Sequence, residues 1–515
     1  MTDNVLFVTA FKDLGRENLL GFERSTDTYI SWFKSLIMLP IRLICFCEKD
    51  IEQRLKIECN FYNTYSYDTE HNFCKYIDKE NEIMNSESFK SLTEHRRDPE
   101  VNKPGYNNVN HNKIYFVNKA KIIFPTYTHY AWIDFGYIRD KQIPEQLDFS
   151  SLRDKIIFFS PNQINCSELL YPIDALLNQS YQIIYGSPFI CPNNLVEWFY
   201  EKYYNMVMLY YANNLVDDYQ EIVKQIIKTE YKMFEIKISN GRFEALNYFS
   251  VPLYIDAVIP TCLKDINDLS YVIKGIRKNI NNIRNIYVVC HRKFKEYIGD
   301  DAIFIDETIF PFSIEDVAEY IFGDRNYSTN SSRSQGWYFQ QLLKLYSFKV
   351  IDGISSNILI VDSETIFYNR YIPIKDNISY YTVSNEINHD YRKHIKLLIP
   401  NINIDNRFSG ICHQMLFQKH ILQNLFDQVE TLHNMPFWIA MLYISKMNNR
   451  MYYSEYDLYF NFIFSFHKNT VKLSSNVKWD ISPIIPETSE YTYITAHNHI
   501  RNTEIKRDTY KVILS

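Results

Sequence analysis

The chain has 515 residues, of which 46% are hydrophobic and 23% charged, and its formal net charge is −6. That length predicts two to four domains, and the hydrophobic fraction excludes a wholly disordered chain. The slight excess of acidic residues argues against a general nucleic-acid binder, which needs a basic face.

The residue usage is unusual in its aromatics and glycines. The chain holds 42 Tyr and 35 Phe but only 12 Gly. Because Tyr, Phe, Ile, Asn and Lys are favoured by AT-rich codons, genome composition explains most of the aromatic excess, and a sugar-stacking surface is the functional alternative. So few glycines argue against glycine-rich phosphate loops, and no GxGxxG or Walker A sequence occurs.

The cysteines and the N-terminus predict the compartment. The nine cysteines form no CxxC pair and show no zinc-site spacing, which favours a reducing environment. The N-terminus does not resemble a signal peptide, and no apolar run approaches the ~20 residues of a membrane span. We therefore expect a cytoplasmic protein without a transmembrane segment.

The first half of the sequence alternates apolar runs of strand length with helical patterns. The expected helices are 26–37 and about 194–228, and the expected strands are 4–11, 41–48, 113–117, 130–136, 154–160 and 181–187. The polar stretch 78–112 predicts a mobile loop or a lid.

The periodicity lapses around residues 238–252, and a new strand at 253–261 places a domain boundary near residue 250. The expected elements that follow are helices at about 264–280, 314–322 and 336–351, and strands at 285–290, 302–308 and 357–367. Alternating strands and helices predict two tandem α/β domains, 1–250 and 251–515, each with a mostly parallel, Rossmann-like sheet flanked by helices.

The clearest chemical motif is Asp362-Ser363-Glu364, which follows the apolar run 357–361. In open α/β sheets, ligands bind beyond the carboxyl ends of the strands. Two carboxylates at i and i+2 on extended backbone share one face, and such a pair can hold Mg²⁺ or Mn²⁺ against a diphosphate. An ordinary strand-end turn accounts for the same residues, so both interpretations stay open.

The surroundings of this motif resemble glycosyltransferases of the GT-A type, in which a helix precedes an Asp-x-Asp strand. The run Trp337-x-x-Gln-Gln-x-x-Lys-Leu carries the resemblance, together with residues 257–261 and 407–422. Residues 454–462 (SEYDLYFNF) are similar to a motif of an uncharacterised family of bacterial glycosyltransferase-like proteins. The resemblance covers about 253–500, and its departure is Asp-Ser-Glu in place of Asp-x-Asp.

The resemblance implies a role for particular residues of the second half. The implied metal ligands are Asp362, Glu364 and His497; the implied sugar-nucleotide contacts are Thr261, Trp337, Gln341 and Lys344; the implied donor or acceptor contacts are His413 and Gln414; and the implied general base is Glu455 or Asp457. For several of these residues a purely structural interpretation stays open. Lys344 is equally a solvated helix lysine, Glu455 equally a first-turn acid after an N-cap, and His497 with His499 is more often a solvent-facing pair.

The first half carries a different resemblance. Residues 8–16, 23–33 and 118–140 resemble the WlaTC/HtrL family, glycosyltransferase-like proteins of bacterial cell-surface glycan loci, and WIDFG (132–136) is the most specific match. The resemblance covers about 4–248. It implies that Asp134 is the metal- or phosphate-side acid, that Thr9 and Arg16 lie near the nucleotide, and that Asp218 and Gln220 lie near the acceptor. A turn acid before Gly136 is the alternative for Asp134.

Together the resemblances imply a bifunctional glycosyltransferase with two GT-A-like domains. It would use a nucleotide sugar, with UDP-sugars the first expectation, and Mn²⁺ or Mg²⁺, to extend a glycan acceptor on a surface polysaccharide or glycoprotein. Trp132, Tyr137, Trp337 and Tyr456 would be placed to stack on sugar rings. The alternative is a catalytic C-terminal domain with a non-catalytic glycan- or nucleotide-binding N-terminal module. The composition fits an AT-rich microbe or a large DNA virus, for which the host cytoplasm or the virion is the expected location.

Overall fold

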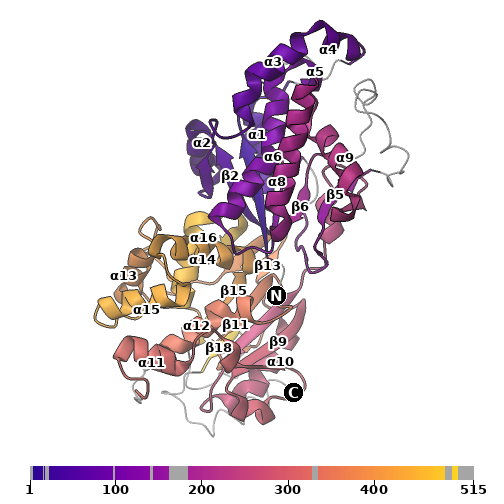
Figure 1. The fold of residues 1–515 in the computed structure, drawn as a ribbon. Helices are drawn as coiled ribbons and strands as arrows, with labels where there is room; N and C mark the ends of the chain where they lie inside the picture. Colours follow the sequence, from indigo (N-terminus) through magenta and orange to yellow (C-terminus); the bar gives the residue numbers. More distant parts are fainter. Residues whose placement is uncertain are drawn as a thin grey trace. The chain divides into compact units, whose positions relative to one another are not determined.

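The computed structural model describes residues 4–15, 17, 23–96, 99–139, 143–161, 184–327, 335–481 and 490–496. The chain divides into two compact units, Asp3–Val251 and Pro252–Ser515. Each unit is built on a mostly parallel sheet flanked by helices, so the predicted mixed α/β fold class is confirmed (Figure 1).

The described part of the first unit forms a seven-stranded sheet in the order β3-β2-β1-β4-β6-β5-β7. The central strand β1 pairs in parallel with β2 and β4, whereas β6 runs antiparallel to β4 and β5. The strands are β1 (Val5–Phe11), β2 (Arg42–Cys47), β3 (Thr64–Ser66), β4 (His129–Trp132), β5 (Ile156–Ser160), β6 (Phe189–Pro192) and β7 (Phe234–Ile238).

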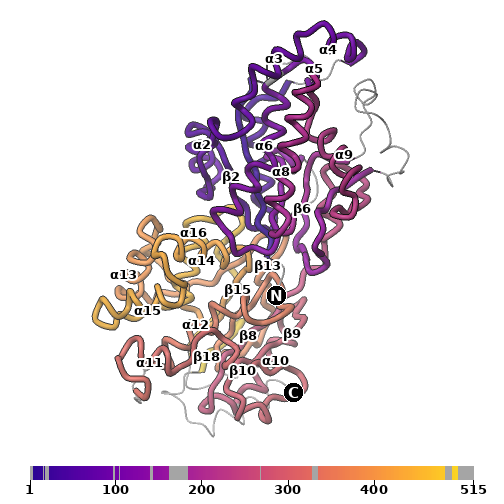
Figure 2. The backbone as a smooth tube through the Cα atoms, in the orientation of Figure 1, coloured from indigo at the N-terminus to yellow at the C-terminus, as the bar shows by residue number. Residues whose placement is uncertain are grey.

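Helices cover both faces of this sheet because side chains alternate along a strand. Leu6 and Val8 of β1 pack among residues of α6, α8 and α9, and Val5 and Phe7 pack among residues of α1 and α2. Figure 2 shows α6 and α8 as neighbouring helices. The helices are α1 (Thr26–Leu36), α2 (Lys49–Cys59), α3 (Ile77–Asn85), α4 (Glu87–Leu92), α5 (Pro99–Asn102), α6 (Pro104–Ile123), α8 (Asn193–Ala212) and α9 (Tyr219–Glu230).

The second unit repeats this plan around a five-stranded sheet in the order β10-β9-β8-β11-β15. Its strands are parallel except β15, which runs antiparallel to β11. Two three-stranded sheets, β12-β18-β17 and β13-β14-β16, accompany it. The strands are β8 (Ile255–Pro260), β9 (Ile283–Cys290), β10 (Ile303–Asp306), β11 (Asn357–Val361), β12 (Thr365–Phe367), β13 (Ile374–Lys375), β14 (Ile378–Tyr381), β15 (Gln414–Gln418), β16 (Val471–Leu473), β17 (Trp479–Ile481) and β18 (Tyr493–Thr495).

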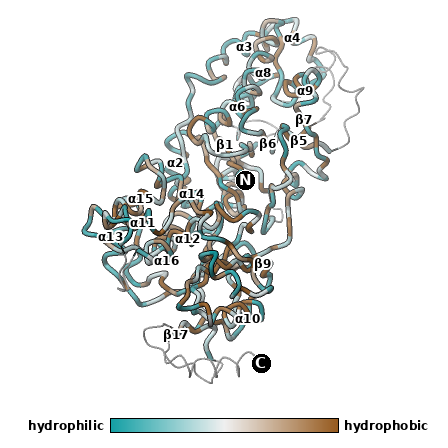
Figure 3. Tube along the Cα trace, turned by 60° about the horizontal axis from the view of Figure 1, so that its bottom comes forward, coloured by the Kyte–Doolittle hydropathy of each residue, from teal (hydrophilic) through white to brown (hydrophobic). Residues whose placement is uncertain are grey.

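The core of the second unit also lies on both sides of its main sheet. Val258 of β8 packs with α12, α14 and α16, whereas Ala257 and Ile259 pack with α10. In Figure 3, hydrophobic segments in brown alternate with hydrophilic ones in teal around β9 and α10. The helices are α10 (Leu269–Asn279), α11 (Ile314–Phe322), α12 (Gln335–Val350), α13 (His389–Leu398), α14 (Lys419–His433), α15 (Phe437–Met447) and α16 (Glu455–Phe466).

The largest correction to the sequence analysis concerns residues 78–117. The predicted loop or lid at 78–112 is mostly helical, and the predicted strand at 113–117 lies inside α6. This helix was missed because part of its buried face is polar: Asn112 Oδ1 accepts from the backbone N–H of Phe73 at 2.9 Å, and Asn108 binds the Phe73 carbonyl. A polar buried face hides the apolar periodicity that marks an amphipathic helix.

Four other predicted elements also differ from the structure. The predicted strand 181–187 is not a strand over its described residues 184–187, and the predicted helix 194–228 is broken between α8 and α9. The strand predicted over 130–136 ends at Trp132. The strand predicted over 357–367 is split by a turn at residues 362–365, in which the backbone N–H of Thr365 donates to the Asp362 carbonyl at 2.9 Å.

No helix among the described residues has both the length and the apolar character needed to cross a membrane.

Candidate functional site

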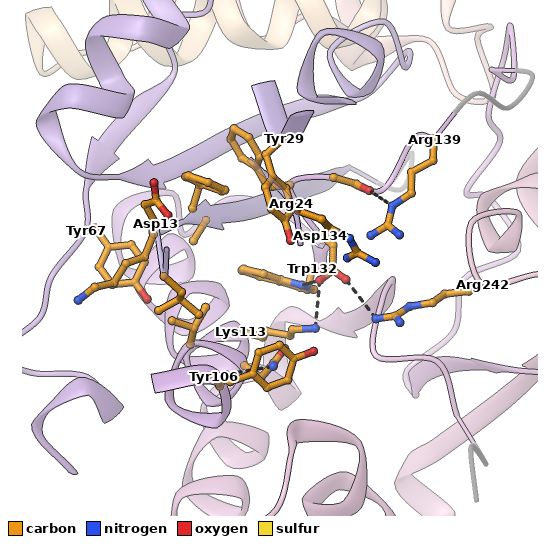
Figure 4. Close-up of a pocket in the computed structure, with 18 residues that line it drawn as sticks. Asp13, Arg24, Tyr29, Tyr67, Tyr106, Lys113, Trp132, Asp134, Arg139 and Arg242 are labelled. Atoms are coloured by element: carbon orange, nitrogen blue, oxygen red, sulfur yellow. Dashed lines mark hydrogen bonds and ion pairs between the residues drawn. The ribbon is translucent and has the colours of Figure 1, made fainter. Parts of the chain in front are cut away.

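The first unit has a pocket of about 150 Å³ beside the carboxyl ends of β1 and β4. This is the edge at which open α/β sheets bind their ligands. Residues 10–14 run from the end of β1 into the pocket, Asp134 and Phe135 follow β4, and α6 supplies Tyr106 and Lys113 (Figure 4). Its basic residues are Lys12, Arg24, Lys113, Arg139 and Arg242, and its acidic residues are Asp13 and Asp134.

Asp134 lies at the centre of the charges in this pocket. Its Oδ1 accepts a hydrogen bond from Trp132 Nε1 at 2.8 Å and pairs with Lys113 Nζ at 3.0 Å, and Arg242 lies 3.6 Å from its Oδ2. Figure 4 shows Lys113 and Arg242 reaching the carboxylate from different sides. Although burial by itself raises the pKa of Asp134, the charges of Lys113 and Arg242 lower it, so the carboxylate is ionised.

Arg139 is held in the pocket by aromatic rings and a backbone carbonyl. Its guanidinium lies 4.4 Å from the Trp32 ring centroid and 4.2 Å from that of Phe243, and its Nε donates to the Gly136 carbonyl at 3.0 Å. Burial, together with the like charges of Arg24 and Arg242, lowers the pKa of Arg139 to about 10. Neither Arg24 nor Arg139 forms an ion pair with a carboxylate among the described residues. The pocket therefore has positive charge to offer an anion.

The other predicted site residues of this unit do not line the pocket. Thr9 is fully buried within β1, and Arg16 lies outside the described residues. Asp218 is the N-cap of α9: its carboxylate accepts from the backbone N–H groups of Gln220 and Glu221 and from the Gln220 side chain. These contacts give Asp218 a structural role.

In the second unit, five residues named from the sequence meet in one buried cluster. Lys344 Nζ of α12 lies 2.5 Å from Asp362 Oδ1, just beyond β11, and 2.6 Å from Glu455 Oε1, at the start of α16. His413 Nδ1 lies 3.0 Å from Asp362 Oδ2, and the Tyr456 hydroxyl donates to Asp362 Oδ1 at 3.0 Å. Lys344 is thus a buried ion-paired residue and not a solvated helix lysine.

The charges of this cluster depend on one another. Burial alone lowers the pKa of Lys344, but Asp362 and Glu455 raise it above its usual range. Burial raises the pKa of Asp362, but Lys344 and His413 outweigh it and hold that pKa well below its usual range. The pKa of Glu455 is raised by burial, and Lys344 opposes the shift. Glu455 is therefore the carboxyl group of the pair that takes up a proton first as the pH falls.

Trp337 and Gln341 position α16. Trp337 Nε1 donates to the Tyr453 carbonyl at 3.3 Å, and Gln341 Oε1 accepts from the backbone N–H of Glu455 at 3.1 Å. Because both contacts lie just before or at the first turn of α16, they fix the position of the Glu455 backbone.

The remaining predicted residues of this unit make their hydrogen bonds outside the cluster. Asp457 is fully buried, accepts from the backbone N–H of Gly410 at 3.2 Å and lies 3.9 Å from Arg392, which makes it an anchor for the loop before β15. Gln414 donates to the hydroxyl groups of Thr382 and Tyr493. Thr261 donates its backbone N–H to the Val289 carbonyl just beyond β8.

The predicted metal ligands do not form a metal site in the described residues. Both oxygens of Asp362 already accept hydrogen bonds or ion pairs, and the turn at 362–365 removes the extended geometry that was expected to align Asp362 with Glu364. No group of three or more His, Cys, Asp or Glu side chains in the described part of the chain could hold a metal ion. His497 and His499 lie outside the described residues. As described, the donor set does not fit a divalent cation.

The aromatic residues proposed for sugar stacking differ in exposure. Tyr137 and Tyr456 are buried and Trp337 is half-buried, whereas Trp132 is buried but lines the pocket of the first unit. Stacking on a sugar needs an open ring face, so Tyr137 and Tyr456 are unsuited to it as placed.

Sequence reasoning missed five cations of the pocket: Lys12, Arg24, Lys113, Arg139 and Arg242. Lys12, Arg24 and Arg139 lie within segments that carried the family resemblance. The usable signal was that basic residues surround the strand-end acid Asp134, but they lie far apart in sequence and only the fold brings them together.

Comparisons with known proteins separate the same two units. Residues 3–251 match a family model described as "Bacterial protein of unknown function (HtrL_YibB)", and residues 253–478 match "Family of unknown function (DUF6492)". The first unit is thus similar to one family and the second unit to the other. The resemblance of the first half to the WlaTC/HtrL family is thereby confirmed, and the second half matches a family that is itself uncharacterised.

Two individual proteins illustrate these similarities. Protein HtrL of Escherichia coli (strain K12) is 29% identical over 238 residues, which are 43% of this chain and 83% of that protein. The crystal structure of mouse xyloside xylosyltransferase 1 in its apo form aligns with 48% of this chain and 99% of that chain, at 9% identity and a TM-score of 0.27. A TM-score of this size does not establish a common fold.

Proposed function

We propose that the chain is a nucleotide-sugar-dependent glycosyltransferase with one active site in each unit, adding sugars to a glycan acceptor of a polysaccharide or glycoprotein. The observation that carries the proposal is the basic, aromatic-lined pocket beside the carboxyl ends of β1 and β4. A nucleotide sugar presents a diphosphate between two rings, and such a pocket offers cations for the one and aromatic faces for the others.

In the first unit, the cations would bind the donor diphosphate and stabilise the charge that grows on it as the sugar leaves. Asp134 would act as a positioning residue, because it holds Lys113 Nζ at 3.0 Å and Arg242 at 3.6 Å. Tyr106 and Trp132 line the same pocket and would contact a ring of the donor.

In the second unit, Glu455 is the residue we propose as the general base for an acceptor hydroxyl. Its raised pKa moves it toward the range in which a general base works best near neutral pH. Lys344 would keep Asp362 and Glu455 in one place, since it is within 2.6 Å of both. His413 would orient Asp362 through the bond at 3.0 Å.

A screen of nucleotide sugars with glycan acceptors tests the proposal, with released nucleoside diphosphate as the readout. Asp134→Asn and Asp362→Asn are compared with the exposed control Asp148→Asn. We expect each of the first two variants to lose a different transfer by tenfold or more and the control to lose none. No release by the wild-type chain with any donor, in Mn²⁺, Mg²⁺ or chelator, would contradict the proposal.

The same assay tests the predicted Mn²⁺ or Mg²⁺ requirement by adding a chelator. Because the described donor set does not fit a divalent cation, no step of the proposed chemistry is routed through one. The cytoplasm, or the virion for a viral source, stays the predicted location.

One observation favours a second candidate, in which the first unit only binds a glycan or nucleotide and the second unit catalyses. Asp218, the predicted acceptor-side acid of the first unit, has both carboxylate oxygens committed to α9. If Asp134→Asn changed acceptor affinity but abolished no transfer, this candidate would replace the bifunctional one.

A further inference from the structure

We infer that the first unit binds the diphosphate of its nucleotide ligand without a divalent cation, using Arg24, Arg139 and Arg242 as fixed positive charges around Asp134. This inference rests on the proposed function, since it takes the ligand to be a nucleoside diphosphate or its sugar ester. It goes further by assigning the phosphate-binding role to three arginines and by removing the metal from that role.

Asp134 is already bound to cations. Lys113 and Arg242 reach its two oxygens, and Trp132 Nε1 donates to the oxygen that Lys113 contacts. A divalent ion at this carboxylate would have to displace Trp132 and both basic groups, or sit beside them against like-charge repulsion. The strand-end acid is thus the counterion of the basic groups, which leaves it poorly suited as a metal ligand.

Three guanidinium groups converge in the pocket, which has too few acidic side chains to balance its basic ones. Arg24, Arg139 and Arg242 all line the pocket, and the like charges of Arg24 and Arg242 add to burial in lowering the pKa of Arg139. Placing like charges together in a partly desolvated pocket costs free energy that a bound anion would return. Arginine also matches phosphate geometry because its planar donors bind two oxygens at once.

Specific packing holds Arg139 in place. We call Arg24, Arg139 and Arg242 the arginine platform. The Arg139 guanidinium lies between the rings of Trp32 and Phe243, 4.4 Å and 4.2 Å from their centroids. Trp32 can approach only because residue 136 is glycine: a Cβ there would lie 2.7 Å from a Trp32 ring carbon. Stacked and hydrogen-bonded to the Gly136 carbonyl, Arg139 loses little further freedom when it binds a ligand.

The size of the pocket fits the diphosphate end of a nucleotide. Its volume of about 150 Å³ is below the roughly 300–1,000 Å³ of pockets that enclose whole ligands. The nucleoside and the sugar would therefore extend beyond it, past the tyrosines that line it, Tyr29, Tyr67 and Tyr106.

Calorimetric titration of the full chain in EDTA tests the inference, with UDP, GDP, ADP and CDP as ligands and inorganic pyrophosphate as a separate arm. We expect at least one nucleotide to bind, and Arg139→Met to weaken its binding tenfold or more. Arg24→Met serves as a second variant in case Arg139→Met lowers the melting temperature of the protein. Arg153→Met, an exposed arginine bonded to backbone carbonyls alone, is the charge-matched control and should bind as the wild type does.

Asp134→Asn separates the inference from a metal site by the sign of its effect. If Asp134 is the counterion of the basic groups, its neutralisation leaves nucleotide binding in EDTA unchanged or tighter. A threefold or greater weakening by Asp134→Asn would overturn the inference.

The failure of the inference and the failure of the proposed function look different. Binding that appears only after Mn²⁺ is added, and is lost again in EDTA, would overturn the inference and leave the proposed function standing. Pyrophosphate binding tighter than all four nucleotides would also overturn it, because the site would then recognise free pyrophosphate. Absence of nucleotide binding in every condition, together with absence of sugar transfer, would overturn both.

Discussion

The two units place a lysine and an aspartate in the same relation but in opposite surroundings. In the first unit, Lys113 of α6 pairs with Asp134 beyond β4; in the second, Lys344 of α12 pairs with Asp362 beyond β11. In each unit the acid-bearing strand lies between a parallel neighbour and an antiparallel one, so the topology around the pair is shared.

The difference lies in the charges that join each pair. In the first unit the pocket residues comprise five basic and two acidic side chains. In the second unit Lys344 contacts two carboxylates, those of Asp362 and Glu455, and is itself 2% exposed. One backbone plan thus carries a positive, partly open site and a buried cluster in which one lysine contacts two carboxylates. The first site therefore has the charges that favour an anion.

Removing the lysine should affect the second unit more than the first. Lys344→Met leaves two buried carboxylates without their cation, which should cost about 3–5 kcal/mol of local stability. Lys113→Met should cost about 1–3 kcal/mol, because Asp134 keeps Arg242 nearby and its side chain is 25% exposed. Hydrogen exchange read from peptides of each unit measures both, with the exposed Lys232→Met as the control. Equal losses would contradict the difference drawn between the two pairs.

Adding a methyl group to a glycine beside each site should again separate the units. At Gly410 a Cβ would lie 2.4 Å from the Phe460 Cβ and 2.7 Å from the Tyr456 carbonyl oxygen, so helix α16 itself must move. At Gly136 the closest atom is a Trp32 ring carbon at 2.7 Å, which a rotating side chain can relieve in part. We expect Gly410→Ala to cost about 3 kcal/mol and Gly136→Ala about 1 kcal/mol, measured by the same exchange experiment.

Gly136→Ala has a second expected effect, because it displaces the ring that supports Arg139. Nucleotide affinity in EDTA should fall with little loss of stability. Gly410→Ala should leave that affinity unchanged, and a fall of equal size in both variants would weaken the assignment of the arginine platform.

Two buried carboxyl groups, Glu80 in the first unit and Asp362 in the second, should contribute to stability with opposite dependence on pH. Glu80, buried beside Tyr211 and His111, has its pKa raised by burial to about 8, against about 4.3 in an unfolded chain. Between these values the folded state keeps a proton that the unfolded state has released, so the stability that Glu80 contributes falls as the pH rises. For Asp362 the pKa is lowered, so its contribution is present above about pH 3.9 and is lost on acidification.

Melting temperatures of the wild type and Glu80→Gln between pH 5 and pH 8 measure this smallest effect. Gln cannot ionise, so the variant should lose less stability than the wild type as the pH rises across that range. Parallel curves for the two proteins would show that Glu80 does not keep its proton.

Local signals made several elements predictable from the sequence. The helix expected over 314–322 has those bounds in the structure, because Ser313 and Asp316 form a capping box and Gly323 ends the helix at a φ of 76°. The strand expected over 285–290 lies within β9, whose last five residues are buried and apolar. By contrast, α6 was invisible as a helix, since Asn108 and Asn112 on its buried face bind the backbone of Phe73.

The candidate sites were predictable in part, for a related reason. Lys344, Asp362 and Glu455 each belong to a recognisable local motif, and the structure places both carboxylates within 2.6 Å of Lys344 Nζ. Arg24, Arg139 and Arg242 belong to no shared motif, because they come from three separate segments and meet only through tertiary packing. A tertiary cluster of this kind leaves no periodic trace in the sequence.

The most direct test is a crystal structure of the full chain grown with the tightest-binding nucleotide in the presence of EDTA. The account predicts density for the two phosphates between Arg24, Arg139 and Arg242, with Lys113 still paired to Asp134. Phosphates bound elsewhere in the chain, or a metal ion coordinated by Asp134 when Mn²⁺ replaces EDTA, would contradict it.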